Sequence, residues 1–385
     1  MGRAGPDGPR HSRSIHRNLL SFGTMVPDAI DFTAVRRVLV TKLRHHGDVL
    51  LASPVIAALK AHAPHLEVDA LVYRETAPML ANHPGLNVLH TIDRDWKRQG
   101  TLEQVRQEWR LLGAMRARRY DLLVHLTEHP RGAWLRRMLG IRHAVAPARR
   151  DASNWWRGSF THFYAQPRGT RRHTVELNLD ALRRIGVHPE DPAKRLVLVP
   201  GAAAEARVDE LLRTHDLARG GFIQLHPGSR WLFKCWPAAR VAALIDQLAG
   251  EGERIVLTGA PDPREQAMIA DIRGRISATV VDLCGQLSLP ELAALTARAR
   301  GFVGVDSAPM HIAAAMGTPS VALFGPSGDI EWGPWMAAHR IVVSDAHPCR
   351  PCGNDGCGGS KVSDCLTTLP VARVHAALRE LVPRG

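Results

Sequence analysis

Three short segments of the sequence carry side chains that could take part in a reaction, and each contains a glycine close to an apolar run. The first, KLRHHGDVLLASP over 42–54, contains Asp48, a carboxylate that could act as a general base or cap a helix. The second, HPGSRWLFKCW over 226–236, contains Lys234, and the third, GVDSAPMH over 304–311, contains Asp306. Their roles depend on the elements that position them.

The second segment has the composition of a diphosphate-binding loop. Gly228 and Ser229 offer backbone amides and a hydroxyl, Lys234 offers a cation, and a helix is predicted just beyond. Because a helix dipole contributes only about 0.3–1 kcal/mol, Lys234 would supply much of the charge. An ordinary strand-to-helix loop with a solvated lysine would have the same residues. The P-loop spacing and the GxGxxG fingerprint are both absent, which counts against a nicotinamide or flavin enzyme.

The third segment places polar side chains where a strand passes into a helix. Asp306 and Ser307 end the predicted strand, and His311 follows one helical turn later. A carboxylate at this point could simply cap the helix. However, Ala308 and the alanines after it are small enough to let a ligand approach the start of the helix, which favours a binding role.

The elements around these segments alternate between short apolar runs and helical stretches, which is typical of parallel α/β construction. We therefore predict an α/β fold of two Rossmann-like halves that face each other across a cleft. Ligands of open α/β sheets bind outside the carboxyl ends of the strands, where all three segments are expected. Strands are predicted at 36–43, 66–73, 88–93, 120–126, 221–227, 254–260, 279–283, 301–307 and 319–327, with an arginine-rich helix over 101–118.

The same pattern predicts how the chain is divided. Residues 1–34 are expected to be a disordered basic leader or the result of a mis-assigned start, with Met25 as the true start. Residues 35–190 should form the first half, 191–220 the inter-domain region, and 221–385 the second half with the cysteine cluster and a terminal helix. The polar stretch 150–175 is expected to be irregular.

Local signals predict three helix ends. Ser53 is a candidate N-cap with Pro54 at the first helical position, so that Asp48 need not cap this helix. Ser288 and Glu291 form a capping box, and Gly317 stands where a C-terminal glycine belongs.

The formal charge of +13 implies anionic partners. No helix-turn-helix signature, aromatic RNA-binding pair or lysine-rich tail is present, so nucleic acid is not among the expected partners. No apolar stretch approaches the roughly 18–20 residues that cross a bilayer. Basic residues crowd one region of the first half, namely Arg94, Lys97, Arg98, Arg106, Arg110, Arg116, Arg118, Arg119, Arg131, Arg136 and Arg137. They suit a phosphorylated substrate at an anionic membrane face, although any one of them could be an ordinary solvated side chain.

The three segments, extended to LVTKLRHHGDVLLASPVIAALK, HPGSRWLFKCWP and GVDSAPMHIAAAMGTPSVALFGPS, resemble the signature regions of glycosyltransferase family 9, the ADP-heptose:lipopolysaccharide heptosyltransferases. The resemblance extends from about residue 36 to 382. Similarity to the heptosyltransferase III branch is greatest in the segments KLRHHGD, DRDWKRQG and PCGNDGCGGSKVSDCL. The family implies a GT-B fold, an inverting reaction and no metal requirement.

The resemblance also implies roles for individual residues. Asp48 matches the family's candidate general base, Lys234 the lysine that meets the donor diphosphate, and Asp306 the aspartate that holds heptose hydroxyls. The other donor-binding matches are Gly228, Ser229, Glu265, Ser307, Ala308 and His311. Many relatives have Thr-Gly where this chain has Ser307-Ala308, so Ala308 can contribute only its amide. His45, His46, Arg94, Lys97 and Arg98 are candidates for binding the acceptor.

Four cysteines near the C-terminus, Cys349, Cys352, Cys357 and Cys365, could supply a structural zinc site. Their spacing is irregular beside that of paired zinc knuckles, and reduced thiols are the expected state. No metal or other cofactor is therefore expected.

The resemblance implies an inverting transfer of L-glycero-D-manno-heptose from ADP-heptose to the phosphorylated inner core of lipopolysaccharide, with residues 35–190 binding the acceptor and residues 221–385 the nucleotide sugar. From the resemblance alone the third, branching heptose is expected, and the enzyme would be cytoplasmic and peripheral on the inner membrane. The alternatives are a transferase for the first or second heptose, or a non-catalytic zinc- or nucleic-acid-binding protein. A non-catalytic binding module would not need Asp48 to face Lys234 and Asp306 across a cleft.

Overall fold

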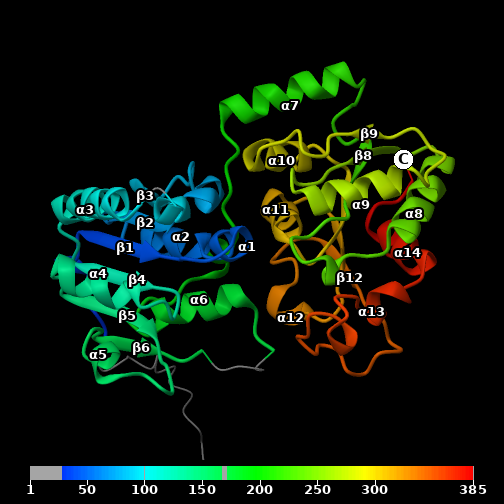
Figure 1. The fold of residues 1–385 in the computed structure, drawn as a ribbon. Coiled ribbons are helices and arrows are strands. Elements are labelled where there is room, and N and C mark those ends of the chain that lie inside the picture. The colour runs from blue at the N-terminus through cyan, green and yellow to red at the C-terminus, as the bar shows by residue number, and fades with distance from the viewer. Residues whose placement is uncertain (1–27, 99, 167–170, 385) are drawn as a thin grey trace, which may run out of the picture.

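The computed structural model describes residues 28–98, 100–166 and 171–384 of the 385-residue chain. Two parallel β-sheets, each covered by helices, lie side by side (Figure 1). The predicted α/β class and tandem Rossmann-like halves are confirmed. In the described residues the first half contains every strand up to residue 164, and the second half contains every strand from residue 222 onward.

The two sheets have the same strand order. The first runs β3-β2-β1-β4-β5-β6, and the second, read from β9, runs β9-β8-β7-β10-β11-β12. In each sheet the order reverses direction beside the first strand, between β1 and β4 and between β7 and β10, which is where α/β proteins bind ligands. The strands are β1 (Arg37–Thr41), β2 (Glu67–Tyr73), β3 (Val88–Ile92), β4 (Leu122–His125), β5 (His143–Pro147), β6 (His162–Tyr164), β7 (Phe222–His226), β8 (Arg254–Leu257), β9 (Val281–Asp282), β10 (Gly301–Val305), β11 (Ser320–Leu323) and β12 (His339–Val342).

Helices connect consecutive strands and cover both sheets. The α-helices are α1 (His46–Leu50), α2 (Ser53–His62), α3 (Thr101–Arg118), α4 (Arg131–Leu139), α5 (Asn154–Arg157), α6 (Thr174–Arg183), α7 (Ala202–Thr214), α8 (Ala238–Gly250), α9 (Pro263–Arg273), α10 (Leu289–Thr296), α11 (Ala308–Met316), α12 (Asp329–Trp332), α13 (Asp364–Thr367) and α14 (Val371–Leu381). Short 3₁₀ turns are η1 (Phe32–Ala34), η2 (Arg74–Met79), η3 (Arg94–Arg98), η4 (Asp191–Lys194), η5 (Leu232–Lys234) and η6 (Cys357–Gly359).

The largest apolar core is not confined to one half. Its buried residues come mainly from β1, β2, α2 and α6, but it also includes Leu292 and Ala293 of α10 and Ile312 and Ala314 of α11. Apolar side chains from the second half therefore close the core of the first. Because buried apolar area stabilises contact by roughly 25 cal/mol per Å², this packing holds the two halves together at the base of the cleft.

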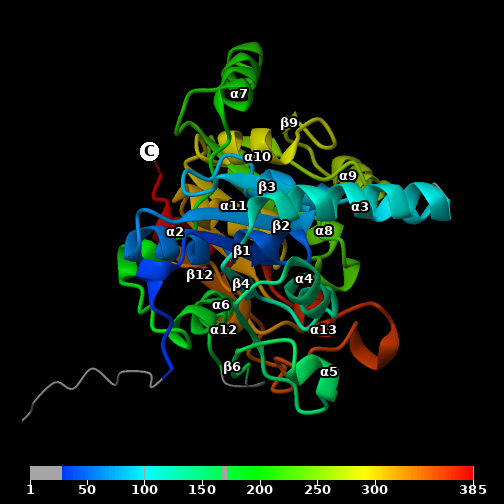
Figure 2. The same ribbon diagram turned by 90° about the vertical axis from the view of Figure 1, so that its left-hand side faces the viewer.

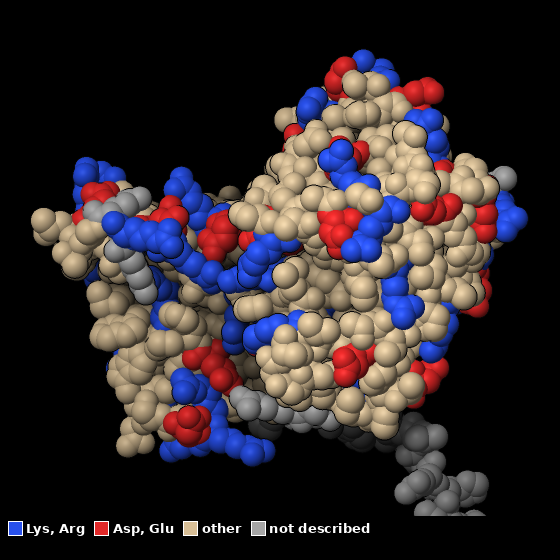
Figure 3. Space-filling view, turned by 45° about the vertical axis from the view of Figure 1, so that its right-hand side comes forward, with Lys and Arg blue, Asp and Glu red and all other residues tan. Residues whose placement is uncertain are grey.

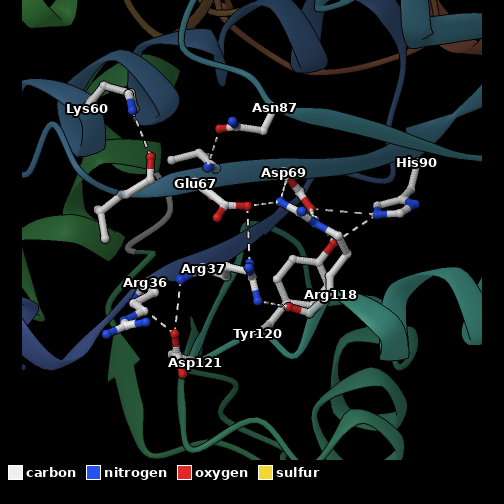
Figure 4. A network of polar contacts seen from close by, with 12 residues as sticks. Arg36, Arg37, Lys60, Glu67, Asp69, Asn87, His90, Arg118, Tyr120 and Asp121 are labelled. Atoms are coloured by element: carbon white, nitrogen blue, oxygen red, sulfur yellow. Dashed lines mark hydrogen bonds and ion pairs between the residues drawn. The ribbon is translucent and has the colours of Figure 1, made fainter.

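A buried ionic network ties α3 to the first sheet (Figure 4). The fully buried Asp69 carboxylate of β2 accepts hydrogen bonds from Arg118 Nε at 2.7 Å and from the Tyr120 hydroxyl at 2.6 Å. Arg118 also donates to Glu67, which Arg37 of β1 contacts at 3.1 Å. Arg118, one of the basic residues expected to suit the acceptor, therefore belongs to the framework instead.

Several local expectations need correction. Residues 28–34 belong to the fold, since Phe32 is buried and Ile30 N donates to Ile185 O; the rest of the expected leader lies outside the described residues. The stretch 150–175 contains α5 and β6, because its aromatic residues are buried. Ser53 is not an N-cap: a separate short helix, α1, precedes it, and its Oγ accepts a hydrogen bond from Val197 N at 2.9 Å.

Two other predicted helix ends are confirmed. Ser288 and Glu291 form both bonds of the capping box on α10, and Gly317 ends α11 with a φ of 72°. The link between the halves, expected over 191–220, contains η4 and then α7. Apolar residues of α7 pack on the second sheet and on α10, so this helix is anchored to the second half.

Candidate functional site

The three segments with candidate site residues meet at the carboxyl ends of the strands, beside the two places where the strand order reverses. The segment 42–54 follows β1, the segment 226–236 follows β7, and Asp306 follows β10. Helices α1 and α11, which begin at these ends, contact each other across the cleft. The parallel sheets thus bring together residues that are more than 170 positions apart in the sequence.

Asp48 lies in the first turn of α1 and is half-buried. It does not cap that helix, since His45 occupies the N-cap position and makes no side-chain capping bond. Within the described residues no hydrogen bond engages the Asp48 carboxylate. Beneath it lies Lys42, whose buried Nζ donates to Asn178 Oδ1 at 3.0 Å. Burial lowers the pKa of Lys42 to about 8, although the negative charge of Asp48 opposes this shift.

Lys234 and Asp306 form a salt bridge on the opposite side of the cleft. The 3₁₀ turn η5 carries Lys234, and its Nζ lies 2.6 Å from Oδ2 of the nearly buried Asp306. The sequence placed both residues at the donor side, and the structure brings them into direct contact. A cation therefore lies where the strand order reverses, between β7 and β10, next to a carboxylate that can accept hydrogen bonds from sugar hydroxyls.

Close packing at Gly228 positions Glu265. A Cβ at Gly228 would lie 2.4 Å from Glu265 Oε2, so only glycine fits there. The same oxygen accepts a hydrogen bond from Ala260 N at 3.0 Å, and burial raises the pKa of the Glu265 carboxyl. Ser229 is buried beside this loop. The predicted donor residues Gly228, Ser229 and Glu265 thus lie together after β7 and β8.

The start of α11 presents backbone and a buried histidine toward the first half. Ser307 occupies the N-cap position without a side-chain capping bond, and its Oγ donates to Val305 O at 3.3 Å. Capping therefore does not account for Asp306 or Ser307. His311 is buried, which lowers its pKa to about 4, and among the described residues its Nδ1 has no hydrogen-bond partner.

Gly47 of the first half lies directly against His311 of the second. A Cβ at Gly47 would lie 2.9 Å from His311 Cδ2 and 3.9 Å from the Ala308 Cα. The glycine before Asp48 is therefore needed for α1 to approach the start of α11. This approach brings Asp48 toward the helix start that Ser307 and Ala308 provide.

Arg230 also spans the cleft, and it was not among the residues predicted for the site. Its Nη1 lies 2.9 Å from His45 Nδ1, and burial together with this cation lowers the pKa of His45. Lys and Arg side chains gather at the hollow between the two halves (Figure 3). Only its position two residues after Gly228, in the predicted diphosphate loop, could have indicated Arg230.

Only some of the residues predicted to bind the acceptor lie close together in the structure. His46 Nε2 lies 2.8 Å from Glu75 O, and Arg94 pairs with Glu75 at 3.1 Å while lying over the Tyr73 ring. Arg94 and His45 line a pocket of about 320 Å³ together with Thr127 and Glu128, whereas His46 does not line it. Arg98 is outside this group, since it is exposed and pairs with Asp95 at 3.4 Å. The Lys97 side chain lies outside the described residues.

The C-terminal cysteines do not form a recognisable metal centre. Cys349, Cys352 and Cys357 are exposed, Cys365 is buried, and none forms a disulfide. Within residues 28–98, 100–166 and 171–384, no group of three or more His, Cys, Asp or Glu side chains is arranged to hold a metal ion. Burial raises the pKa of the Cys365 thiol, as expected for a packed cysteine.

Comparisons with known proteins show the family and the fold. A family model described as glycosyltransferase family 9 (heptosyltransferase) matches residues 108–362. The chain is 37% identical to lipopolysaccharide heptosyltransferase 3 of Escherichia coli over 343 residues, covering 89% of this chain and 98% of that protein.

Solved structures show the same fold. A family 9 glycosyltransferase from Veillonella parvula superimposes with a TM-score of 0.78 at 22% identity, covering 90% of this chain and 97% of that one. The E. coli heptosyltransferase WaaC with ADP-2-deoxy-2-fluoro heptose gives a TM-score of 0.66 at 19% identity, covering 89% and 99% of the two chains. The fold is therefore GT-B.

Proposed function

The chain belongs to glycosyltransferase family 9, and from this premise we propose that it transfers L-glycero-D-manno-heptose from ADP-heptose to the inner core of lipopolysaccharide, as the third, branching heptose. Support for the third position comes from the 37% identity to an E. coli heptosyltransferase 3 across nearly the whole of that protein. A solved WaaC complex holds an ADP-heptose analogue in the same fold, which supports the donor.

One observation carries the proposal: Asp48 follows β1 on one side of the cleft, and the Lys234–Asp306 pair follows β7 and β10 on the other. An inverting transfer needs a base on one side of the anomeric carbon and a leaving-group site on the opposite side. Asp48 would take the proton from the acceptor hydroxyl, whose oxygen forms the new bond to the anomeric carbon. The bond from that carbon to the ADP phosphate oxygen breaks, and the leaving ADP carries away the electron pair.

The donor side would stabilise the departing diphosphate by charge and by backbone amides. Lys234 supplies the cation, and the start of α11 at Ser307 and Ala308 supplies N–H groups and the positive end of a helix dipole. When the phosphates engage Lys234, Asp306 is released to accept hydrogen bonds from the heptose. No step in this scheme requires a metal ion.

The acceptor side would be the pocket beside His45. Arg94 lines it with His45 and could contact phosphate or sugar hydroxyls of the inner core. We place the protein at the cytoplasmic face of the inner membrane as a peripheral enzyme, because a lipid-borne acceptor lies at that surface. Among the described helices, none has the length and apolar character needed to cross a membrane.

The test is incubation of the purified protein with ADP-heptose and a series of truncated core acceptors that carry no, one or two heptoses, followed by mass analysis. Addition of a single heptose to the acceptor with two heptoses is the expected result. Addition only to shorter acceptors would reassign the enzyme to the first or second heptose. No addition to any acceptor would overturn the proposed function.

A further inference from the structure

An apolar groove on the outside of the first half has no part in the proposed reaction. It lies between α3 and α4 and has a volume of about 460 Å³. Leu102 is 86% exposed, Trp109 62% and Trp134 58%, and Val105 and Met138 are exposed beside them. We call Leu102, Val105, Trp109, Trp134 and Met138 the α3–α4 patch. Contiguous apolar surface of this kind marks a binding face on a water-soluble fold.

The spacing of these residues shows that the patch is built into the helices. Leu102, Val105 and Trp109 recur at i, i+3 and i+7 on α3, and Trp134 and Met138 at i and i+4 on α4, so each helix has an apolar outer face. Met115 of α3 is buried and contributes to the core, which means that α3 is apolar on two sides. Helix α3 also projects beyond the sheet (Figure 2).

The margin of the patch is positively charged. Both carboxylates of α3 are neutralised, since Glu103 pairs with Arg106 at 3.6 Å and Glu108 pairs with Arg131 at 2.6 Å. The remaining arginines of this margin are exposed and have no acidic partner among the described residues; they are Arg110, Arg116 and Arg119. The patch therefore offers tryptophan and leucine side chains next to unpaired guanidinium groups.

We propose that the α3–α4 patch docks the protein on the surface of an anionic lipid bilayer. Tryptophan favours the headgroup level of a bilayer, because its ring is apolar and its N–H is polar. Arginines at the margin would meet lipid phosphates, as on amphipathic interfacial helices. The inference rests on the proposed function, since a lipid-borne acceptor is what requires contact with a membrane.

Charge and position both favour a bilayer over a second copy of the chain. Pairing two patches would bring their unpaired arginines together, and like charges across an interface are unfavourable. In addition, His129 lines both the groove and the pocket beside His45. A glycolipid held in a bilayer under the patch could therefore extend its sugars into the proposed acceptor pocket.

The first experiment measures flotation of the purified protein with vesicles of phosphatidylglycerol and phosphatidylcholine, compared with phosphatidylcholine alone. Val105→Asp should lower binding to the anionic vesicles at least about tenfold, since a carboxylate would enter the apolar face. Val362→Asp is the matched control, because Val105 and Val362 are 52% and 48% exposed and Val362 lies far along the chain near the cysteines. The double variant Trp109→Ser, Trp134→Ser should lose binding as well.

A second pair of variants tests the charged margin. Arg110→Glu should weaken binding to anionic vesicles by about 10–30-fold, and added salt should reduce the difference. Arg207→Glu makes the same change of charge at an exposed arginine of α7 and should bind like the wild type. Equal loss in the two arginine variants would mean that net charge alone drives binding, which would overturn the role of the patch.

Transfer activity separates this inference from the proposed function. With a water-soluble core oligosaccharide that lacks acyl chains, the patch variants should match the wild type, whereas with acceptor in vesicles they should be slower. Vesicle binding that is unchanged in Val105→Asp and in the tryptophan double variant would overturn the inference, as would a dimer in sedimentation that these changes dissociate. Patch-dependent vesicle binding without heptose transfer to any acceptor would leave the inference standing and remove the proposed function.

Discussion

Asp48 is suited to act as a base because its surroundings leave its carboxylate available. It is half-buried, no described residue hydrogen-bonds to it, and the buried cation of Lys42 lies behind it. Closure of the cleft would remove water from this carboxylate. These conditions allow a side chain on one half to act on a substrate that the other half holds.

We expect Asp48→Asn to lower kcat by about 10²–10⁴-fold, which is the usual contribution of a positioned general base. The affinity for ADP should be unchanged, because the proposed diphosphate site lies on the second half. Calorimetric titration with ADP and a heptose-transfer assay would measure both quantities. Asp95→Asn, at an exposed carboxylate outside the pocket, is the control. A variant with near-wild-type kcat would remove Asp48 from the base role.

Substitution of Gly228 should also lower activity, in this case for a steric reason. Gly228→Ala would place a methyl group 2.4 Å from Glu265 Oε2 and displace that buried carboxylate together with its bond to Ala260 N. A displacement of this size should cost about 10–100-fold in kcat/KM for ADP-heptose. The control is Gly113→Ala in α3, where a Cβ meets no atom within 4 Å; it should raise stability by about 0.5–1 kcal/mol. Equal activity of the two variants would contradict the steric argument.

Site residues could be predicted from the sequence where a reactive side chain follows a glycine in a loop at the end of a strand. Asp48, Lys234 and Asp306 could be selected in this way, and the last two are in contact in the structure. Arg230 and the contact between Gly47 and His311 could not be predicted, because each depends on how the two halves approach each other. No local pattern encodes a distance across a cleft.

At the scale of elements, α3 is held by the ionic network around Asp69 (Figure 4). Removing the carboxylate in Asp69→Ala would leave Arg118 with Glu67 alone and the Tyr120 hydroxyl without its acceptor. We expect a loss of about 3 kcal/mol in the free energy of unfolding, measured with urea. Asp95→Ala breaks an exposed pair with Arg98 and should change stability by less than about 0.5 kcal/mol.

Long periodic elements were predictable, and short buried ones were not. The helix expected over 101–118 begins and ends at those residues, since its periodic pattern and arginine content are strong local signals. In contrast, β6 is only three residues long and lies in a polar stretch, and its strand state depends on pairing with β5. Helix α1 was also missed, because a five-residue helix has no room for a periodic pattern.

At the scale of the whole molecule, buried histidines should make the protein sensitive to acid. Burial lowers the pKa of His125, His173, His226 and His311 to about 4, whereas the unfolded chain titrates near the ordinary value of 6.5. Between these values the unfolded state binds more protons, so stability falls as pH decreases from about 6.5 to 4. Each histidine can contribute up to about 1.4 kcal/mol per pH unit.

Urea unfolding at several pH values would measure this slope. His125→Gln should reduce the slope by up to one proton, while His188→Gln, at an exposed histidine, should leave it unchanged. A stability that stays constant from pH 6.5 to 5 would contradict the burial of these four imidazoles in neutral form.

The apolar core shared between the halves has a consequence for synthesis on the ribosome. The first sheet and its helices are complete once Leu198 has been made, yet four core residues, from Leu292 to Ala314, arrive about 94 to 116 codons later. At translation rates of about 5–20 residues per second, the nascent first half would wait roughly 5–23 s with this apolar face uncovered. During that interval the growing chain is a natural client for a chaperone, and rare codons between α6 and α10 would lengthen its exposure.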